Sequence, residues 1–276
     1  MELAKEGVAQ HYNPPYVWRL FATALSFSLF GIGGLILRIV VFPLIHLCVK
    51  DQQKKQAYCR LAVHKTFKFF VGFMNCSGVL FYDLKGAERL GQPGQMIIAN
   101  HPSLIDVVLI IAQVKNANCI VKQSIWHNPF MRGPVRAANY ISNNGSIEMF
   151  DESVQVLQQG QTLIIFPEGT RTTPGKAPEF HRGAASIALK GARVITPVLI
   201  NVSPTTLTKA EPWYKIPARR VHFTIEVGED INPNDFLQSN NMPKASRQLN
   251  TYLHDYFLKE LTQHESIRNT DQTIDH

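Results

Sequence analysis

The distribution of apolar and polar residues divides the chain into three regions. Residues 20–37 carry no charge, and after one arginine an apolar run continues to residue 49. Beyond residue 78, short apolar runs alternate with stretches of helical periodicity, and the end of the chain is polar. We therefore expect a hydrophobic helical region, an α/β domain and a polar tail that frays at its end. Their predicted bounds are 1–77, 78–262 and 263–276.

The alternating pattern beyond residue 78 predicts an α/β fold with a mostly parallel central sheet flanked by helices. The short apolar runs predict seven strands, at Val79–Lys85, Gln95–Asn100, Asn118–Val121, Asn139–Ser142, Gln161–Phe166, Arg193–Val202 and Arg220–Val227. The amphipathic stretches predict helices at Ser103–Gln113, Ile147–Gln159, Gly183–Lys190 and Pro243–Leu261. The fold class expected is this α/β domain preceded by a hydrophobic, membrane-associated helical segment.

The hydrophobic segment is long enough for a membrane, since a span needs about 20 mainly apolar residues. Either Leu20–Val49 forms one tilted or kinked span, or the segment enters one leaflet and returns. Its three glycines between residues 31 and 34, with Arg38 and Pro43, favour a break in the middle. A buried core helix is the alternative. A cleavable signal peptide is disfavoured, because the stretch is too long and no small-residue cleavage site follows.

Basic residues concentrate beside this segment. Lys plus Arg exceed Asp plus Glu by 28 to 21, and the net charge of +7 favours anionic partners. Aromatic residues interleave with six basic ones, at Lys50, Lys54, Lys55, Arg60, Lys65 and Lys68. That mixture is typical of a helix on an anionic membrane surface, here expected to be the cytoplasmic face of the plasma (inner) membrane. A nucleic-acid partner is disfavoured, because the sequence has no recognised nucleic-acid motif.

The cysteines predict a reducing compartment. Cys48, Cys59, Cys76 and Cys119 form no CxxC pair and no metal-ligand spacing. We therefore expect reduced core thiols in the cytoplasm and no metal site.

The first candidate for chemistry is NHPSLID, residues 100–106, at the end of a predicted strand. Open α/β sheets bind ligands at the carboxyl ends of their strands. Residues five apart on a helix point about 140° apart, so His101 and Asp106 can touch only if His101 precedes the helix, as Pro102 favours. A carboxylate bonded to one ring nitrogen leaves the other free to act as a general base. The alternative is a His–Asp pair that only caps the helix.

The second candidate is FPEGTRTT, residues 166–173, at the end of another predicted strand. Gly169 allows a positive φ or a close approach of the backbone to a ligand. The planar guanidinium of Arg171 suits a phosphate or a carboxylate. Glu168 can hold Arg171 or accept a hydrogen bond from a hydroxyl. A salt bridge between these two residues at the strand end is the alternative.

Together the two segments resemble the glycerophospholipid acyltransferase family, of the lysophosphatidate (1-acylglycerol-3-phosphate) acyltransferase type. The resemblance rests on NHPSLID, on FPEGTR some 65 residues later, and on the stretches FHRGA and VITPV that follow. It spans roughly residues 79–228.

The resemblance implies transfer of an acyl group from acyl-CoA or acyl-carrier protein to a hydroxyl of a lyso-lipid acceptor, without a metal or organic cofactor. His101 would be the general base, and Asp106 would orient it. Arg171 would contact a phosphate, and Pro197 would shape the acyl or acceptor pocket. The full set of substrate-binding residues implied is Asn100, Ser103, Glu168, Gly169, Thr170, Arg171 and Pro197.

One departure from the family pattern bears on the acceptor. Residues 139–145, NYISNNG, carry asparagines where the family usually has a phosphate-binding arginine. Lys122, Arg132 and Arg136 lie nearby in the sequence and could supply the charge; otherwise the acceptor is a specialised lipid without that phosphate. A non-catalytic protein that binds lipid or acyl-carrier protein is the other alternative. A hydrolase is disfavoured, because the sequence has no GxSxG nucleophile elbow.

Overall fold

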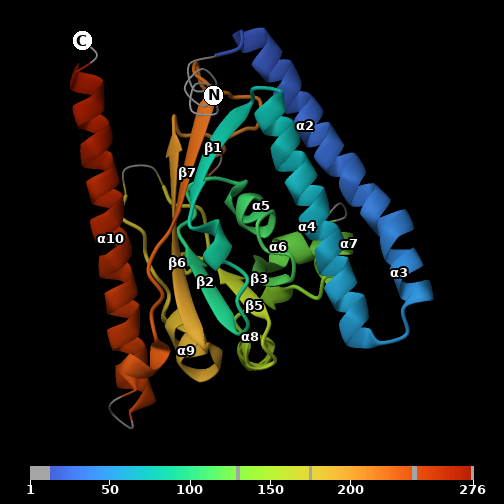
Figure 1. The fold of residues 1–276 in the computed structure, drawn as a ribbon, viewed down its shortest axis with the longest axis vertical. Helices are drawn as coiled ribbons and strands as arrows, with labels where there is room; N and C mark the ends of the chain where they lie inside the picture. Colours follow the sequence, from blue (N-terminus) through green and yellow to red (C-terminus); the bar gives the residue numbers. More distant parts are fainter. Residues whose placement is uncertain (1–12, 129–130, 174–175, 210, 238–240, 275–276) are drawn as a thin grey trace.

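A single sheet forms the centre of the protein (Figure 1). The computed structural model describes residues 13–128, 131–173, 176–209, 211–237 and 241–274. Within these ranges seven strands pair in the order β1-β7-β6-β2-β5-β3-β4. The strands are β1 Leu80–Lys85, β2 Gln95–Ala99, β3 Ala117–Lys122, β4 Ile141–Asn143, β5 Thr162–Ile165, β6 Val194–Ser203 and β7 Val221–Val227. Neighbouring strands are parallel except for β6 and β7, which confirms the predicted mostly parallel sheet.

Helices cover both faces of the sheet (Figure 1). The helices of the domain are α5 Asp106–Ile111, α6 Gln123–His127, α7 Arg132–Ala137, α8 Ile147–Gln158, α9 Arg182–Gly191 and α10 Met242–Ile274, with short 3₁₀ turns at Ala87–Arg89 (η2) and Pro233–Phe236 (η3). In β2, Met96 and Ile98 join the core under α8, α9 and α10, while Ile97 and Ala99 join the core on the α5 side. Such an uninterrupted apolar strand is what a parallel sheet covered on both faces requires.

The N-terminal region is a helical hairpin on the outside of the α5 face (Figure 1). α2 (Tyr16–Ile36), η1 (Leu37–Val41) and α3 (Phe42–Cys48) form one continuous helical segment, and α4 (Gln52–Cys76) returns beside it. The continuous segment has 33 residues and is apolar enough to cross a membrane, yet only 11% of its most apolar window is buried. That exposure argues against the core-helix alternative.

The break expected in this segment is a local change of helical pitch. The amide N–H of Phe42 donates to the carbonyl of Leu37, five residues back, which makes a π-turn just before Pro43. Because a proline inside a helix has no N–H to donate, the helix must adjust near it. The adjustment leaves the segment continuous, so the glycines at residues 31–34 do not interrupt it.

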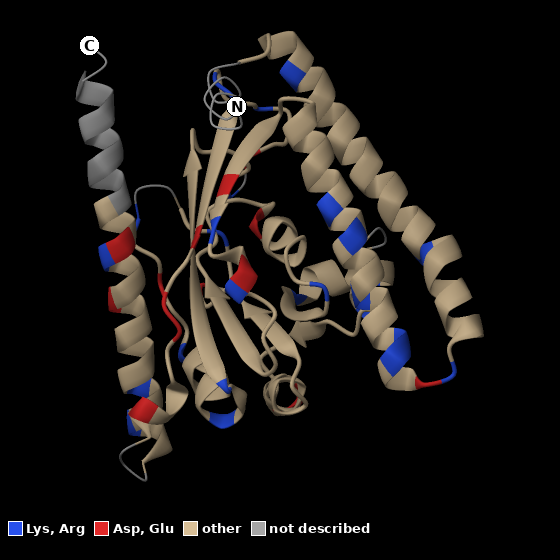
Figure 2. Ribbon diagram, in the orientation of Figure 1, with Lys and Arg blue, Asp and Glu red and all other residues tan. Residues whose placement is uncertain are grey.

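Charged and apolar residues separate between the two arms of the hairpin (Figure 2). The outer arm, residues 16–48, carries Arg19 and Arg38 and no acidic residue, whereas lysines follow the inner arm, α4. Exposed apolar side chains run along the outer arm and form what we term the outer apolar stripe: Val17, Trp18, Phe21, Leu25, Ile32, Leu35, Ile36, Ile39, Val40, Leu44 and Leu47.

Four helices of the domain differ from the sequence prediction. α5 begins at Asp106 and not at Ser103, because the Ser103 hydroxyl and the Leu104 amide bond to the segment after β6 instead of starting a helical turn. α6 and α7, which are short, were not predicted. α10 continues to Ile274, through the polar stretch expected to fray.

Two predictions about single residue types are also corrected. Cys59 and Cys119 are buried thiols as expected, but Cys48 and Cys76 are exposed. Arg60, predicted as part of the basic membrane-facing group, is only 3% exposed.

The buried Arg60 joins α4 to the sheet. Its guanidinium donates to the side-chain oxygens of Asn116 (2.6 Å) and Asn118 (3.4 Å) and to the carbonyl oxygen of Ala138 (3.2 Å). A buried guanidinium is tolerated only when hydrogen bonds replace its hydration, and these three acceptors supply them. The hairpin is therefore fixed to the domain by a specific polar contact as well as by apolar packing.

We predict that Arg60→Ala lowers the free energy of unfolding by about 2–4 kcal/mol, because it leaves buried acceptors without donors. Urea denaturation of the detergent-solubilised protein, followed by circular dichroism, measures the change. Lys68→Ala, at an exposed position of the same helix, is the matched control. Equal stability of the two variants would contradict the structural role of Arg60.

Candidate functional site

Two loops meet at one edge of the sheet, where neighbouring strands end. β2 and β5 are parallel neighbours, with Met96 beside Leu163 and Ile98 beside Ile165. His101 follows β2, and Glu168 follows β5. The carboxyl ends of adjacent parallel strands are where open α/β sheets bind ligands.

The first loop holds His101 against Asp106, as the sequence predicted. The ring nitrogen Nδ1 of His101 lies 2.9 Å from Oδ2 of Asp106, and the same oxygen accepts the amide N–H of Ser103 at 2.6 Å. Asp106 is the first residue of α5, and His101 lies on the turn before it. The His101 ring also packs against Phe166 of the second loop, with ring centroids 4.5 Å apart.

The environments of the two side chains differ. The Asp106 side chain is completely buried, while 17% of the His101 side chain is exposed. Burial raises the pKa of the Asp106 carboxyl, and the hydrogen bonds from His101 and Ser103 offset part of that rise. Since Nδ1 faces the carboxylate, Nε2 is the ring nitrogen left to meet a ligand.

The second loop is bonded directly to the first. Glu168 accepts the amide N–H of His101 (3.0 Å) through one carboxylate oxygen and the hydroxyl of Thr172 (2.6 Å) through the other. The amide N–H of Thr172 in turn donates to the carbonyl of His101 at 2.8 Å. Burial raises the pKa of the Glu168 carboxyl. Gly169 adopts φ = +62°, which completes the tight turn between these contacts.

Arg171 does not pair with Glu168, so the salt-bridge alternative is wrong. One terminal nitrogen of Arg171, Nη1, donates to the carbonyls of Leu207 (2.8 Å) and Thr208 (2.9 Å), in the connection between β6 and β7. This arginine therefore positions a third segment at the site.

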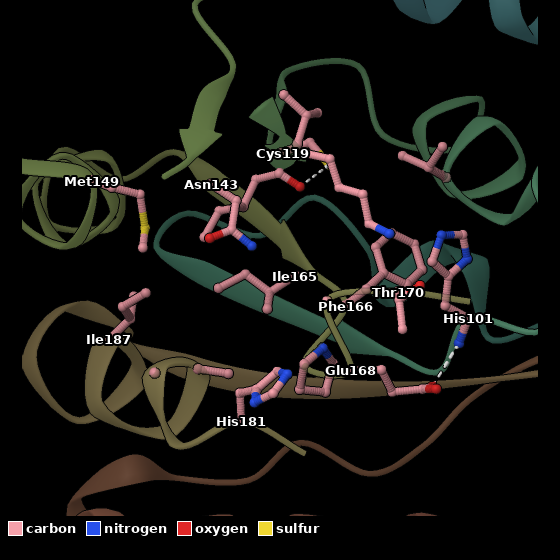
Figure 3. A pocket seen from close by; sticks show the side chains of 18 of the residues that line it. His101, Cys119, Asn143, Met149, Ile165, Phe166, Glu168, Thr170, His181 and Ile187 are labelled. Atoms are coloured by element: carbon pink, nitrogen blue, oxygen red, sulfur yellow. Dashed lines mark hydrogen bonds between the residues drawn. The ribbon is translucent and has the colours of Figure 1, made fainter. Parts of the chain in front are cut away.

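A cavity of about 500 Å³ opens beside His101 (Figure 3). Polar groups line the part next to the two loops, among them His101, Glu168, Thr170 and His181. Apolar side chains line the rest, including Ile165 at the end of β5, Met149 of α8 and Ile187 of α9. Figure 3 shows Met149 and Ile187 on the opposite side of the cavity from His101.

Lys122, at the end of β3, lies within the electrostatic influence of two other cations, Arg171 and Lys209. Lys122 lines the cavity and is the register partner of Asn143 in β4, which also lines it. Partial desolvation, together with the positive charges of Arg171 and Lys209, lowers the pKa of the Lys122 ammonium. Of the three basic residues that the sequence offered, Lys122 is the one that lines this cavity, whereas Arg136 lies over the Trp126 ring.

Several residues implied by the resemblance lie outside the cavity. The side chain of Asn100 exchanges two 2.8 Å hydrogen bonds with the backbone of Ile200. The Ser103 hydroxyl donates to the carbonyl of Thr206 at 3.0 Å. Pro197 is buried within β6, beside Ile98 of β2. These three residues do not line the cavity; they pack and hydrogen-bond in the strands and loops that support it.

Other residues at the site had little signal in the sequence. Phe166 and Thr172 flank the EGTR segment, and the segment itself was the only sign of their role. His181 stands in the FHRGA stretch and lines the cavity beside the second loop, where its amide N–H donates to the carbonyl of Pro167 at 3.0 Å. The contribution of the β6–β7 connection had no sequence signal, because it depends on contacts between distant segments.

Comparisons with known proteins agree with this architecture. Residues 81–201 match the family described as Acyltransferase. A 1-acyl-sn-glycerol-3-phosphate acyltransferase of Pseudomonas aeruginosa is 22% identical over 66% of this chain, and one of Helicobacter pylori is 31% identical over 51% of it. A protein of the same name from Limnanthes alba is 27% identical over 56% of this chain. The chain spans 69%, 65% and 56% of the lengths of these three proteins, in the same order.

The fold also matches a solved structure. The crystal structure of the 1-acyl-sn-glycerophosphate acyltransferase of Thermotoga maritima superimposes with a TM-score of 0.60 at 20% identity. The match covers 86% of this chain and 97% of that one. The matched family model, the named relatives and this common fold agree: residues 81–201 form an acyltransferase domain, and the chain is similar to O-acyltransferases of the 1-acyl-sn-glycerol-3-phosphate acyltransferase type.

Proposed function

We propose that this protein transfers a fatty acyl group from a thioester donor, acyl-CoA or acyl-carrier protein, to the hydroxyl of a lysophospholipid of the 1-acylglycerol-3-phosphate type. The observation that carries the proposal is the 2.9 Å contact between His101 and the buried Asp106 at the edge of a cavity. It resembles the acid–imidazole pair of enzymes that activate a hydroxyl, with the substrate supplying the hydroxyl.

In this mechanism Nε2 of His101 takes the proton of the acceptor hydroxyl as its oxygen attacks the thioester carbonyl. Asp106 fixes the ring tautomer and stabilises the imidazolium that forms. The tetrahedral intermediate collapses with cleavage of the C–S bond, and the thiolate recovers the proton from His101. The products are an ester and a free thiol, so no other reactant is required.

The cations at the end of β3 support an acceptor that carries a phosphate. Lys122 lines the cavity, and Arg171 and Lys209 act on its pKa through their charges. Cations that repel one another in this way favour an anion among them. The named relatives act on 1-acyl-sn-glycerol-3-phosphate, whose phosphate is an anion.

The apolar part of the cavity supports the assignment of a fatty acyl substrate. Ile165, Met149 and Ile187 offer a surface on which a hydrocarbon chain could be buried next to His101. The cavity does not discriminate between CoA and carrier-protein donors, because both present the same thioester.

The helical hairpin supports association with one membrane leaflet. Its inner arm, α4, packs on the domain over much of its length, so the outer arm cannot cross a bilayer without taking the domain with it. The outer apolar stripe can instead be buried in the acyl region of one leaflet, with lysines such as Lys65 and Lys68 at its anionic surface. The excess of lysine favours the cytoplasmic leaflet of the plasma membrane.

A specialised lipid acceptor without the phosphate is the second candidate. The observation in its favour is Asn143, an uncharged side chain that lines the cavity and belongs to residues 139–145, the stretch in which the family usually has an arginine. The acceptor experiment with Lys122 below separates the two candidates.

We predict that His101→Ala lowers kcat of acyl transfer by roughly 10²–10⁴-fold, the usual contribution of a general base. Release of free thiol from a labelled acyl-CoA, with the lipid product identified by mass, measures it. His127→Ala, an exposed histidine in α6, is the matched control. Full turnover by a correctly folded His101→Ala variant would remove this residue from the mechanism.

We predict that Asp106→Asn lowers activity but raises the free energy of unfolding at pH 7. The folded-state pKa of Asp106 is raised, so its ionised form destabilises the fold above that pKa. The increase in the free energy of unfolding that asparagine gives should therefore shrink as the pH falls through the raised folded-state pKa of Asp106. It should vanish below about pH 3.9, the pKa of aspartate in the unfolded chain. Urea denaturation across this pH range measures it. A gain that grows toward low pH has the wrong sign and would contradict the assignment.

We predict that Lys122→Met lowers kcat/KM for lysophosphatidate by roughly 10–100-fold, the contribution of one hydrogen bond to a charged group. The rate with a monoacylglycerol of the same chain length should change little, because it has no phosphate. Arg132→Met, at an exposed position of α7, serves as the control. An equal loss with both acceptors would favour the second candidate.

A further inference from the structure

The connection between β6 and β7, residues 204–220, is bonded to the catalytic turn. The carbonyl of Thr206 accepts the Ser103 hydroxyl at 3.0 Å. The carbonyl of Leu207 accepts two donors, the amide N–H of Leu104 (3.2 Å) and Nη1 of Arg171 (2.8 Å). The start of this connection is therefore fixed to both loops of the site.

The other end of the same connection is bonded to the membrane hairpin. Arg19 of α2 is only 2% exposed, and its guanidinium donates to the carbonyls of Pro217 (2.9 Å) and Ala218 (2.6 Å). Its third contact, to the carbonyl of Pro14 at 3.1 Å, holds the start of α2 in place. The connection thus links the outer arm of the hairpin to the catalytic edge.

Between these anchors the connection presents an exposed aromatic tip, residues 212–215, with the sequence PWYK. Trp213 and Tyr214 are 42% and 59% exposed. The Trp213 ring packs against Phe27 of α2 at 5.7 Å and against the Tyr214 ring at 5.8 Å. The tip therefore lies on the flank of the helix that carries the outer apolar stripe.

The charges near the tip suit an anionic surface. Lys209, Lys215 and Arg219 are exposed. The nearby acid, Glu211, already accepts hydrogen bonds from the amide and hydroxyl of Thr208 and lies 3.9 Å from Lys215. Tryptophan and tyrosine next to lysine are the residues that collect at the boundary between lipid head groups and acyl chains.

We propose that the PWYK tip is a second bilayer contact beside the outer apolar stripe, and that it sets the height of the catalytic cavity above the lipid surface. This inference rests on the proposed membrane association of the hairpin. A bilayer fits the tip better than a protein partner, because the exposed aromatic rings lie against α2, the helix that carries the stripe, and are accompanied by basic residues. The bonds to Arg171 and Ser103 couple the position of the tip to the site.

Depth-dependent fluorescence quenching tests the contact directly. The chain has three tryptophans, so Trp18→Phe with Trp126→Phe leaves Trp213 as the single reporter. Vesicles of phosphatidylcholine and phosphatidylglycerol with brominated acyl chains should quench Trp213 and shift its emission to shorter wavelength. The matched control replaces all three tryptophans by phenylalanine and adds Tyr252→Trp, because Tyr252 is 45% exposed on α10, on the opposite side of the sheet (Figure 1). That reporter should remain unquenched.

A kinetic comparison tests the consequence. Trp213→Ser with Tyr214→Ser should lower turnover of lysophosphatidate embedded in these vesicles by about tenfold, the effect of losing part of two buried aromatic surfaces. Turnover of a short-chain acceptor dispersed as monomers should stay unchanged, since neither residue lines the cavity. Trp213→Phe with Tyr214→Phe should retain most of the vesicle activity.

The outcomes separate the inference from the proposed function. Vesicle binding with an unquenched Trp213 overturns the tip contact and leaves the hairpin as the membrane anchor. Quenched Trp213 in a protein without transferase activity supports the contact and rejects the proposed reaction. A dimer, measured by light scattering, that dissociates in the serine variant, while Trp213 of the single-tryptophan protein stays unquenched by vesicles, would assign the tip to a second copy of the chain and overturn the proposal.

Discussion

The buried carboxylate of Asp106 is the constraint around which the candidate site is arranged. Its Oδ2 accepts both the His101 ring and the amide N–H of Ser103, so one oxygen fixes the imidazole and the backbone turn that carries it. The carboxyl is completely buried, and its raised pKa reports that burial of the charge is only partly compensated. The site therefore keeps an interaction that costs stability, because an exposed carboxylate would not hold the ring in one orientation.

A second buried acid, Glu168, connects the loop that carries His101 to the neighbouring loop. Glu168 bonds the His101 backbone on one side and the Thr172 hydroxyl on the other, so the two loops form one rigid unit. Arg171 then bonds the β6–β7 connection through a single nitrogen, Nη1. The guanidinium can position a segment through one nitrogen while its positive charge still acts on Lys122. Structural and electrostatic roles thus coincide in one side chain.

Two buried arginines, one in each arm of the hairpin, join the hairpin to the domain. Near the sheet, Arg60 of α4 is satisfied by acceptors from the domain, and near the start of α2, Arg19 is satisfied by carbonyls of the β6–β7 connection. Buried guanidinium groups with fixed acceptors allow little sliding between the parts, because any shift would leave a charge without partners. An apolar surface on the hairpin is therefore held at a constant distance from His101.

The sequence by itself determined the seven strands and the His101–Asp106 contact. Both depend on near neighbours: strand formation on the alternation of short apolar runs, and the contact on a five-residue spacing in which Pro102 keeps His101 outside the helix. These features could be predicted because local propensity and fold class agree.

The tertiary structure alone decided which polar side chains support the site and which line it. A basic residue in a helical run has the same sequence signal whether it is buried or exposed, and Arg60 is buried only because Asn116, Asn118 and Ala138 come to it from other elements. In the same way Arg171 meets carbonyls 36 and 37 residues away. Hydrogen-bond partners distant in sequence are chosen by packing, and no local pattern encodes them.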